Sequence, residues 1–164
     1  MQLYFVRHAT ASSKTKWTAD DDLRPLTSAG RLRFATACEA LVGAGALQPD
    51  LIVTSPILRA SQTAELLREI LPGPAKLVED ERLGHGFDLA GLAAVLGEHP
   101  ATSGVAIVGH NPSFEAVLSA VTGASDIDVR KGAIALVDIH DLAEPSGRLM
   151  WLAPPTLFAR RNGG

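Results

Sequence analysis

Four side chains that can bind or attack a phosphoryl group follow three apolar runs of the sequence. Arg7 and His8 come directly after the first run, Arg59 lies about one helical turn past the second, and His110 follows the third. Guanidinium groups form paired hydrogen bonds to phosphate oxygens, and an imidazole can serve as nucleophile or as electrostatic partner. These residues are the candidate catalytic site, and they indicate phosphoryl transfer through a phosphohistidine.

The apolar runs predict parallel strands that bring the four residues together. Residues 3–6, 51–53 and 105–108 are short, continuous apolar segments, as strands buried on both faces are. Segments with helical periodicity alternate with them, so we expect a three-layer α/β/α sandwich with a mostly parallel sheet. The carboxyl ends of parallel strands lie at one edge of the sheet, where ligands bind in such folds.

Helix starts are predicted close to the site. Ser55-Pro56 and Asn111-Pro112 each combine a capping side chain with a proline suited to the first helical position. Helices that begin there would direct backbone N–H donors and positive dipole ends toward a bound anion. Thr27 and Asp88 are expected to cap two further helices.

The C-terminal part of the chain predicts the rest of the sheet. Residues 133–139 and 149–152 are expected to form a hairpin that adds an antiparallel strand at the sheet edge. The tail at 153–164 contains prolines and is basic, and we expect it to fray. Residues 1–164 contain no repeat or linker, so the whole chain is expected to be a single domain.

Composition narrows the class of partner. The formal net charge is -3, which does not favour nucleic acid or an anionic membrane as a partner. The single cysteine, Cys38, lies in a helical pattern and is expected to be a small buried hydrophobe. No signal peptide is evident, so we expect a cytoplasmic protein.

Three motifs resemble those of the histidine phosphatase, or phosphoglycerate-mutase-like, superfamily. Residues 7–9 (RHA) are similar to its N-terminal R-H-G motif, residues 55–64 (SPILRASQTA) to its second-arginine motif, and residues 108–112 (VGHNP) to its second-histidine motif. The R-H-A variant, the short chain and residues 22–30 (DLRPLTSAG) are similar to the SixA-type phosphohistidine phosphatases within it.

The resemblance implies a phosphoglycerate-mutase-like fold and a role for each site residue. His8 would be the nucleophile that carries the phosphoryl group, while Arg7, Arg59 and His110 would bind its oxygens. The sequence has neither a P-loop nor carboxylates at magnesium spacing, so we expect a metal-independent reaction without a cofactor.

A proton donor for the leaving group is less clearly marked. Many members of the superfamily supply a carboxylic acid from the loop after the third strand, where Glu81 is the nearest candidate here and His85 is an alternative. The SixA-type branch is expected to manage without this acid. An imidazole leaves more readily than an alkoxide, so an absent acid would favour phosphohistidine as substrate.

The spacing of the motifs favours an open site. The residues between Arg59 and His110 are used by half a helix, a strand, a loop and a helix, which leaves no insertion for a lid over a metabolite. We therefore expect a phosphorylated protein, a component of a phosphorelay or phosphotransfer system, as substrate. The alternatives are a phosphatase of small phosphate esters and, less favoured, a non-catalytic phosphate-binding module.

Overall fold

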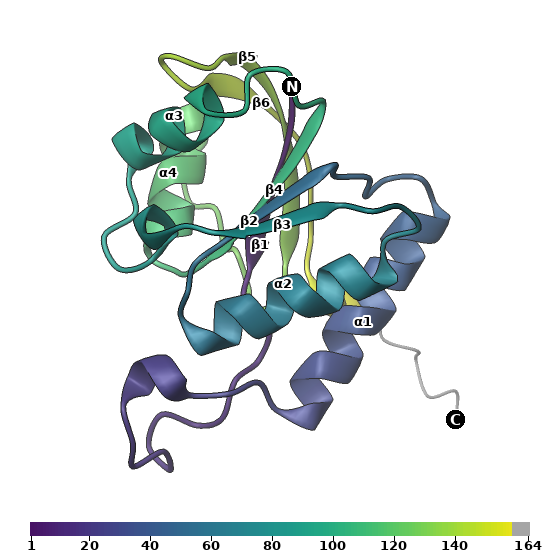
Figure 1. The fold of residues 1–164 in the computed structure, drawn as a ribbon, viewed down its shortest axis with the longest axis vertical. Coiled ribbons are helices and arrows are strands. Elements are labelled where there is room, and N and C mark those ends of the chain that lie inside the picture. The colour runs from purple at the N-terminus through teal and green to yellow at the C-terminus, as the bar shows by residue number, and fades with distance from the viewer. Residues whose placement is uncertain (159–164) are drawn as a thin grey trace.

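A mixed β-sheet forms the middle layer of the computed structural model, which describes residues 1–158. The strand order in this described part is β3-β2-β4-β1-β5-β6, and the first four strands are parallel (Figure 1). The strands are β1 (Gln2–Arg7), β2 (Leu51–Thr54), β3 (Lys76–Glu79), β4 (Gly104–Gly109), β5 (Ile134–Asp141) and β6 (Ser146–Ala153).

The predicted hairpin is confirmed, with one difference in its arrangement. Strand β5 pairs antiparallel with β1, and β6 pairs antiparallel with β5 at the edge of the sheet. The strand that runs against the others is therefore β5, one place in from the edge. The edge strand β6 points the same way as β1, because the hairpin reverses the chain a second time.

Helices cover both faces of the sheet, which confirms the three-layer α/β/α sandwich (Figure 1). Two helices pack on one face and two on the other. They are α1 (Ser28–Gly43) with α2 (Leu58–Ile70), and α3 (Leu89–Gly97) with α4 (Ser113–Thr122). Short 3-10 helices lie in the connections, at η1 (Asp21–Leu23), η2 (Glu81–Leu83) and η3 (Pro155–Leu157).

Strand β1 is held from both faces. Leu3 and Phe5 pack into the apolar cluster beneath α3 and α4, whereas Tyr4 and Val6 pack into the cluster beneath α1 and α2. The ring of Phe5 meets that of Phe114 edge to face, with centroids 5.5 Å apart. Burial of each such side chain contributes about 1.5–3 kcal/mol. The strand therefore gives the residues at its end a rigid base.

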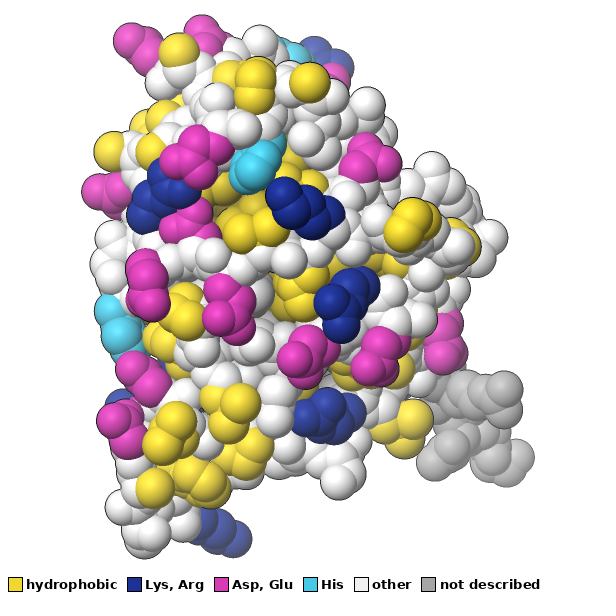
Figure 2. Space-filling view, viewed as in Figure 1, with side chains coloured by type: hydrophobic (Ala, Val, Ile, Leu, Met, Phe, Trp, Pro, Cys, Tyr) yellow, Lys and Arg dark blue, Asp and Glu magenta, His cyan; other side chains and the backbone are white. Residues whose placement is uncertain are grey.

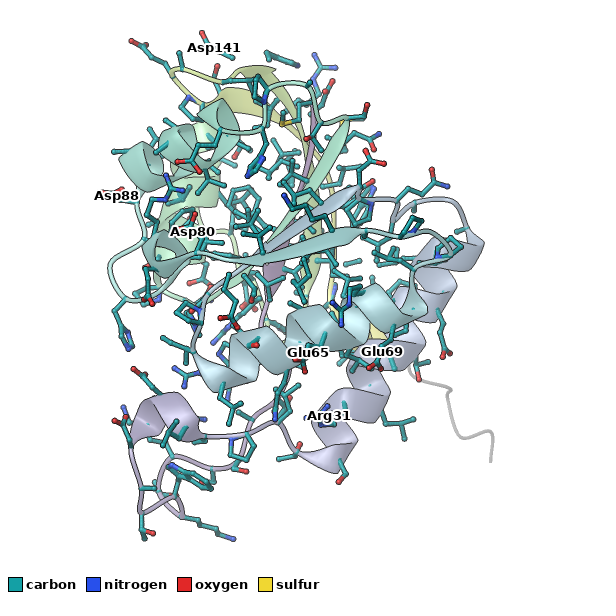
Figure 3. All side chains as sticks on the ribbon, viewed as in Figure 1. Arg31, Glu65, Glu69, Asp80, Asp88 and Asp141 are labelled. Atoms are coloured by element: carbon teal, nitrogen blue, oxygen red, sulfur yellow. The ribbon has the colours of Figure 1, made fainter. Side chains whose placement is uncertain are left out.

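The predicted caps at Thr27 and Asp88 are confirmed. Thr27 Oγ1 accepts a hydrogen bond of 2.9 Å from the N–H of Gly30, and Asp88 Oδ1 accepts one of 2.8 Å from the N–H of Gly91. Asp88 is seen at the beginning of α3 in Figure 3. Each side chain thus satisfies one of the free N–H groups in the first turn of its helix.

The predicted helix starts beside the site are wrong by a few residues. Helix α2 begins at Leu58 rather than at Ser55-Pro56, and helix α4 begins at Ser113, after a cis peptide bond between Asn111 and Pro112. Ser55 still accepts a hydrogen bond, 3.2 Å from the Ile57 N–H, but its hydroxyl also contacts a site residue. Tertiary contacts of these side chains replace the local caps.

The thiol of Cys38 faces the interior from α1, as predicted. It has no solvent exposure, and burial raises the pKa of the thiol well above its usual range. It belongs to the apolar cluster on the α1 and α2 side of the sheet, together with Phe34. Cys38 therefore behaves as a small hydrophobic residue in this fold.

The C-terminal residues continue beyond the last strand. Ala153 ends β6, η3 follows, and Phe158 packs against the cluster beneath α1 and α2. The expected fraying of residues 153–164 is therefore wrong for residues 153–158, and residues 159–164 lie outside the described residues.

Replacement of Gly30 by alanine is expected to destabilise the fold by about 2 kcal/mol, because its Cβ would overlap the carbonyl oxygen of Thr10. The loop that leads from the end of β1 would have to shift. Gly43 on the same helix has open space around it, so Gly43→Ala is the matched control and should be neutral or slightly stabilising. Urea unfolding of both variants measures the difference, and equal stabilities would contradict the packing argument.

Candidate active site

The parallel sheet brings the ends of β1, β2 and β4 together as predicted. Arg7 lies opposite Gly109 in the β1–β4 register, and the N–H of His8 donates to the Gly109 carbonyl at 3.0 Å. His8 and His110, each one residue past its strand, therefore face each other with ring centroids 5.2 Å apart. The side chain of His8 is buried, with only 6% of its surface exposed.

Arg59 reaches the same place from the first turn of α2. Thr63 Oγ1 donates a hydrogen bond of 2.7 Å to the backbone carbonyl of Arg59, and it accepts one of 3.0 Å from the N–H of Ala9. Thr63 thus joins the first turn of α2 to the residue after His8. Arg59 is buried, and its charge acts on both His8 and His110.

The tautomer of His8 is fixed by its neighbour. His8 Nδ1 lies 2.8 Å from the carbonyl oxygen of Ala9. A carbonyl can only accept, so Nδ1 carries the hydrogen and donates it. A neutral His8 then has its lone pair on Nε2, which is the form that a nucleophilic imidazole requires.

The surroundings of His8 keep it neutral. Burial is the largest cause of a pKa lowered to about 4, and the positive charges of Arg59, Arg7 and Lys131 lower it further. The hydrogen bond to the Ala9 carbonyl acts in the opposite direction and is outweighed. The Nε2 lone pair is therefore free of a proton at neutral pH, since protonation would place another cation among buried positive charges.

His110 is held by Ser55. Its Nε2 lies 3.0 Å from Ser55 Oγ, which also accepts from the Ile57 N–H and has both a hydrogen to donate and a second lone pair to accept with. When Ser55 donates to Nε2, a neutral His110 carries its hydrogen on Nδ1, which is buried and unpaired among the described residues. Burial, followed by the neighbouring His8 and Arg59, lowers the pKa of His110 to about 3.

The two arginines are oriented by different parts of the chain. Arg7 donates from Nη1 to the carbonyl of Val129 at 2.7 Å. Arg59 donates to the carbonyl of Asp21 at 2.8 Å and forms an ion pair of 3.3 Å with its carboxylate. Asp21 also pairs with Arg24 at 3.0 Å. Each guanidinium is thereby held in place with part of its donor set unused.

Unpaired buried nitrogen atoms gather at this site. Arg7 Nε, Arg59 Nε and His110 Nδ1 are buried and have no hydrogen-bond partner in residues 1–158. Buried donors without partners are rare and destabilising, and three of them from neighbouring strand ends indicate a place for a ligand. Oxygen atoms of an anion would satisfy all three donors.

His85 lies at the entrance, whereas Glu81 lies farther along the same loop. The His85 ring stacks near that of His110 with centroids 6.4 Å apart, and His85 Nε2 lies 3.0 Å from Asp22 Oδ1. Its side chain is 72% exposed. Glu81 is exposed, and its carboxylate forms no hydrogen bond or ion pair with the described chain. Of the two candidate proton donors, His85 is therefore the one next to the His110 ring.

Sequence patterns did not reveal several residues that shape the site. The sequence marks Ser55 only as a helix cap and gives no sign of a role for Asp21 at the site. Neither Thr63 nor the carbonyl of Val129 was predicted to orient a site residue. The spacing RASQT could have pointed to Thr63, since a residue four positions after Arg59 lies on the same helix face.

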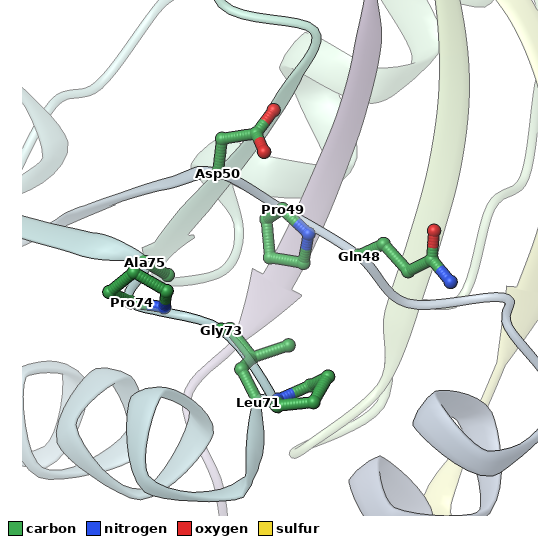
Figure 4. Close-up of a pocket in the computed structure, with 8 residues that line it drawn as sticks. Gln48, Pro49, Asp50, Leu71, Gly73, Pro74 and Ala75 are labelled. Carbon is green, nitrogen blue, oxygen red and sulfur yellow. The ribbon is translucent and has the colours of Figure 1, made fainter.

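A second pocket lies at the opposite edge of the sheet and contains none of these residues. It has a volume of about 310 Å3 and is formed by residues 48–50, which precede β2, and residues 71–75, which precede β3 (Figure 4). Its loops join the amino ends of the strands. It is therefore separate from the site at the carboxyl ends.

Acidification is expected to destabilise the fold through the two histidines. The pKa of His8 is about 4 and that of His110 about 3, both below the ordinary value of 6.5. Below about pH 6.5 the two histidines bind protons in the unfolded chain but not in the folded chain. The free energy of unfolding therefore falls as the pH falls from about 6.5 toward the folded-state pKa values. Between about pH 7.5 and about pH 5 we expect a loss of about 2 kcal/mol for each histidine.

Urea unfolding at the two pH values tests this expectation. His8→Asn should lose less stability on acidification than the wild type, whereas His140→Asn, at an exposed position on β5, should behave like the wild type. A wild-type stability that does not change over this range would contradict the neutral, buried state of the pair.

Comparison with known proteins places the chain among related sequences. The model of the histidine phosphatase superfamily (branch 1) matches residues 3–85. An uncharacterised protein of Picosynechococcus sp. (strain PCC 7002) is 35% identical over 153 residues, covering 85% of this chain and 90% of its own. Within residues 1–158, no helix is both long and apolar enough to cross a lipid bilayer.

Solved structures share the whole fold. The protein histidine phosphatase SixA, solved as a complex with tungstate, matches with a TM-score of 0.84 at 25% identity, over 96% of this chain and 99% of its own. A SixA-like protein of Nakamurella multipartita matches with a TM-score of 0.73 at 25% identity, over 94% and 95% of the two chains. An alpha-ribazole-5'-P phosphatase of Escherichia coli shares the fold with a TM-score of 0.74 at 16% identity, over 94% and 98%.

Proposed function

Because the chain belongs to the histidine phosphatase superfamily, we propose that it is a metal-independent phosphatase that works through a phosphohistidine on His8. The observation that carries this proposal is the hydrogen bond from His8 Nδ1 to the Ala9 carbonyl. This hydrogen bond leaves Nε2, with its lone pair, as the reactive atom. Two guanidinium groups that have unpaired donors belong to the same site.

The reaction proceeds in two transfers at phosphorus. His8 Nε2 attacks the phosphorus atom, an N–P bond forms, and the bond to the leaving group breaks with its electron pair on the leaving atom. Arg7, Arg59 and the Nδ1–H of His110 bind the phosphoryl oxygens and stabilise the charge that develops on them. Water then attacks the phosphohistidine, releases phosphate and returns His8 to its neutral form.

The favoured substrate is a phosphohistidine on another protein. The protein histidine phosphatase SixA, with which this chain shares its fold over nearly its whole length, supports this choice. The exposure of His85 at the entrance supports an open site that a protein side chain can enter. The leaving imidazole takes up a proton readily, so the reaction does not depend on a strong acid in the protein.

A small phosphate ester is the second candidate substrate. His85, with Asp22 at 3.0 Å, stands where a proton could be delivered to an alkoxide leaving group, and Glu81 is the weaker candidate for that role. An alpha-ribazole-5'-P phosphatase shares the fold, so this fold accommodates ester substrates. A non-catalytic phosphate-binding module is the least favoured alternative, because the nucleophile and its partners are all in place.

Parallel assays separate these substrates. The wild-type protein is offered a chemically phosphorylated histidine protein, free phosphohistidine, and a panel of sugar and glycerate phosphates. We expect kcat/KM to be highest for the phosphohistidine protein. Faster turnover of an ester by a large factor would assign the enzyme to small metabolites, and no turnover of any substrate would favour a binding module.

The remaining proposals concern partners and location. A phosphorelay or phosphotransfer protein is the proposed partner, with no role for nucleic acid, a membrane, a metal or a cofactor. A cytoplasmic location stays a prediction from the sequence.

A further inference from the structure

A groove leads away from the catalytic histidines along the surface. It has a volume of about 590 Å3 and begins at Asp22 and His85, which stand beside His110. We call it the acidic groove. Its walls come from η1, the beginning of α2 and the segment from β3 to His85.

Apolar surface in the acidic groove is open to solvent. Leu23 is 58% exposed, although it is a large hydrophobic side chain, and Pro56 and Leu58 on the facing wall are half-buried. Figure 2 shows hydrophobic side chains gathered at the lower left with acidic side chains beside them, in the region where the N-terminal loop approaches the start of α2 in Figure 1. Exposed apolar surface beside a functional site is typical of a contact with another molecule.

The charged side chains that line the acidic groove are all carboxylates. Asp22, Glu79 and Glu81 line it, and neither a lysine nor an arginine is among its lining residues. Within residues 1–158, the Glu79 carboxylate accepts a hydrogen bond only from the Ser61 hydroxyl, at 3.1 Å, and the Glu81 carboxylate has no partner. At least two carboxylates therefore face the groove without a cation from this chain.

This charge pattern selects among phosphorylated molecules. The phosphoryl group itself meets Arg7 and Arg59, whereas the part of the substrate that extends into the groove meets carboxylates. A second anionic group there would be repelled, and a cationic side chain would be attracted. Metabolites with a further phosphate or carboxylate are disfavoured, and a segment with both apolar and basic side chains is favoured.

We propose that the acidic groove docks the protein that carries the phosphohistidine, through an apolar side chain against Leu23 and Leu58 and a lysine or arginine against Glu79 and Glu81. This inference rests on the proposed function and adds the kind of surface that its partner presents. The contact is small, as suits a transient encounter between an enzyme and a protein substrate. Its electrostatic part acts mainly on the rate of association and on the choice of partner.

A pair of phosphohistidine peptides tests the proposal. Both are phosphorylated chemically with phosphoramidate and carry a leucine near the phosphohistidine, but one has lysines and the other glutamates at the flanking positions. The wild type is expected to prefer the lysine peptide by about tenfold in kcat/KM at low salt. The preference should shrink at about 0.5 M salt, where exposed charges are screened.

Variants then locate the preference in the groove. Glu79→Lys should abolish or reverse the preference, and Leu23→Ser should slow both peptides several-fold, while hydrolysis of free phosphohistidine stays at the wild-type rate. Glu65 lies on the exposed face of α2 (Figure 3) and is not among the residues that line the groove, so Glu65→Lys is the matched charge control. It should retain the wild-type preference.

The outcomes distinguish this inference from the function on which it rests. Equal hydrolysis of both peptides by the wild type, or equal effects of Glu79→Lys and Glu65→Lys, would overturn docking in the acidic groove and leave the phosphatase function intact. Variants that slow free phosphohistidine as much as the peptides would also overturn it, since they would act through the catalytic centre. Failure of the wild type to hydrolyse free phosphohistidine and both peptides would instead contradict the proposed function.

Discussion

The His8→Ala variant is expected to lose phosphatase turnover by a factor of about 10^4 or more, because it lacks the nucleophile. Nε2 of His8 is the only protein atom proposed to form a bond to phosphorus, and no neighbouring group among the described residues is proposed to replace it. His110 Nε2 is already engaged by Ser55 Oγ, and His110 is proposed to bind the phosphoryl oxygens. Steady-state assays of the purified variant measure the loss.

Trapping of the intermediate makes this prediction specific. Wild-type protein quenched during turnover of a phosphate-labelled substrate should carry an acid-labile, alkali-stable label on His8, and His8→Ala should carry none. His140→Ala changes an exposed histidine on β5 and should retain both the activity and the label. A label on another residue, or a label that survives acid, would refute the mechanism.

Replacement of Arg59 by alanine is expected to lower kcat/KM by about 10^3-fold. Arginines that neutralise a transferring phosphoryl group contribute 10^3- to 10^5-fold in related chemistry, and here two of them share that task. The guanidinium also anchors Asp21, so its removal frees the carboxylate at 3.3 Å to repel the substrate. Arg59→Lys restores the charge without the planar fork and should recover only part of the activity.

Controls separate this effect from a loss of folding. Arg68 lies exposed on the same helix, and Arg68→Ala should have nearly wild-type kinetics. The thermal midpoint of each variant is measured alongside its kinetics. If Arg59→Ala retains full kcat/KM while folded, or if Arg59→Lys is as active as the wild type, the proposed role of the guanidinium is wrong.

The strands and the four central residues of the site could be predicted from the sequence because their signals are local. Each apolar run marks a strand, and a polar residue directly after the run falls at the strand end whatever the rest of the chain does. This rule alone was enough to predict the positions of Arg7, His8 and His110. The position of Arg59 required, in addition, that one turn of helix follow the second strand. The order of the strands and the position of β5 depended on how the hairpin folds back, which local patterns do not encode.

The residues that orient the site could not be predicted, since their contacts join distant parts of the chain. Ser55 meets His110 across two strands, and Asp21 meets Arg59 through a loop that folds over the strand ends. The motif Ser-Pro is typical of a helix start, yet helix α2 begins only at Leu58, and the Ser55 hydroxyl contacts His110. Tertiary contacts of this kind override local propensity.

Oxidants are expected to leave catalysis unaffected, which follows from the burial of Cys38. Phosphatases that use a cysteine nucleophile depend on a low thiol pKa, and the resulting thiolate is what peroxide attacks. Here the proposed nucleophile is an imidazole, and the chain's single thiol has a raised pKa inside the α1 side of the core. Hydrogen peroxide or iodoacetamide should leave turnover unchanged, so the enzyme would continue to remove phosphoryl groups during oxidative stress, when thiol-dependent phosphatases stop.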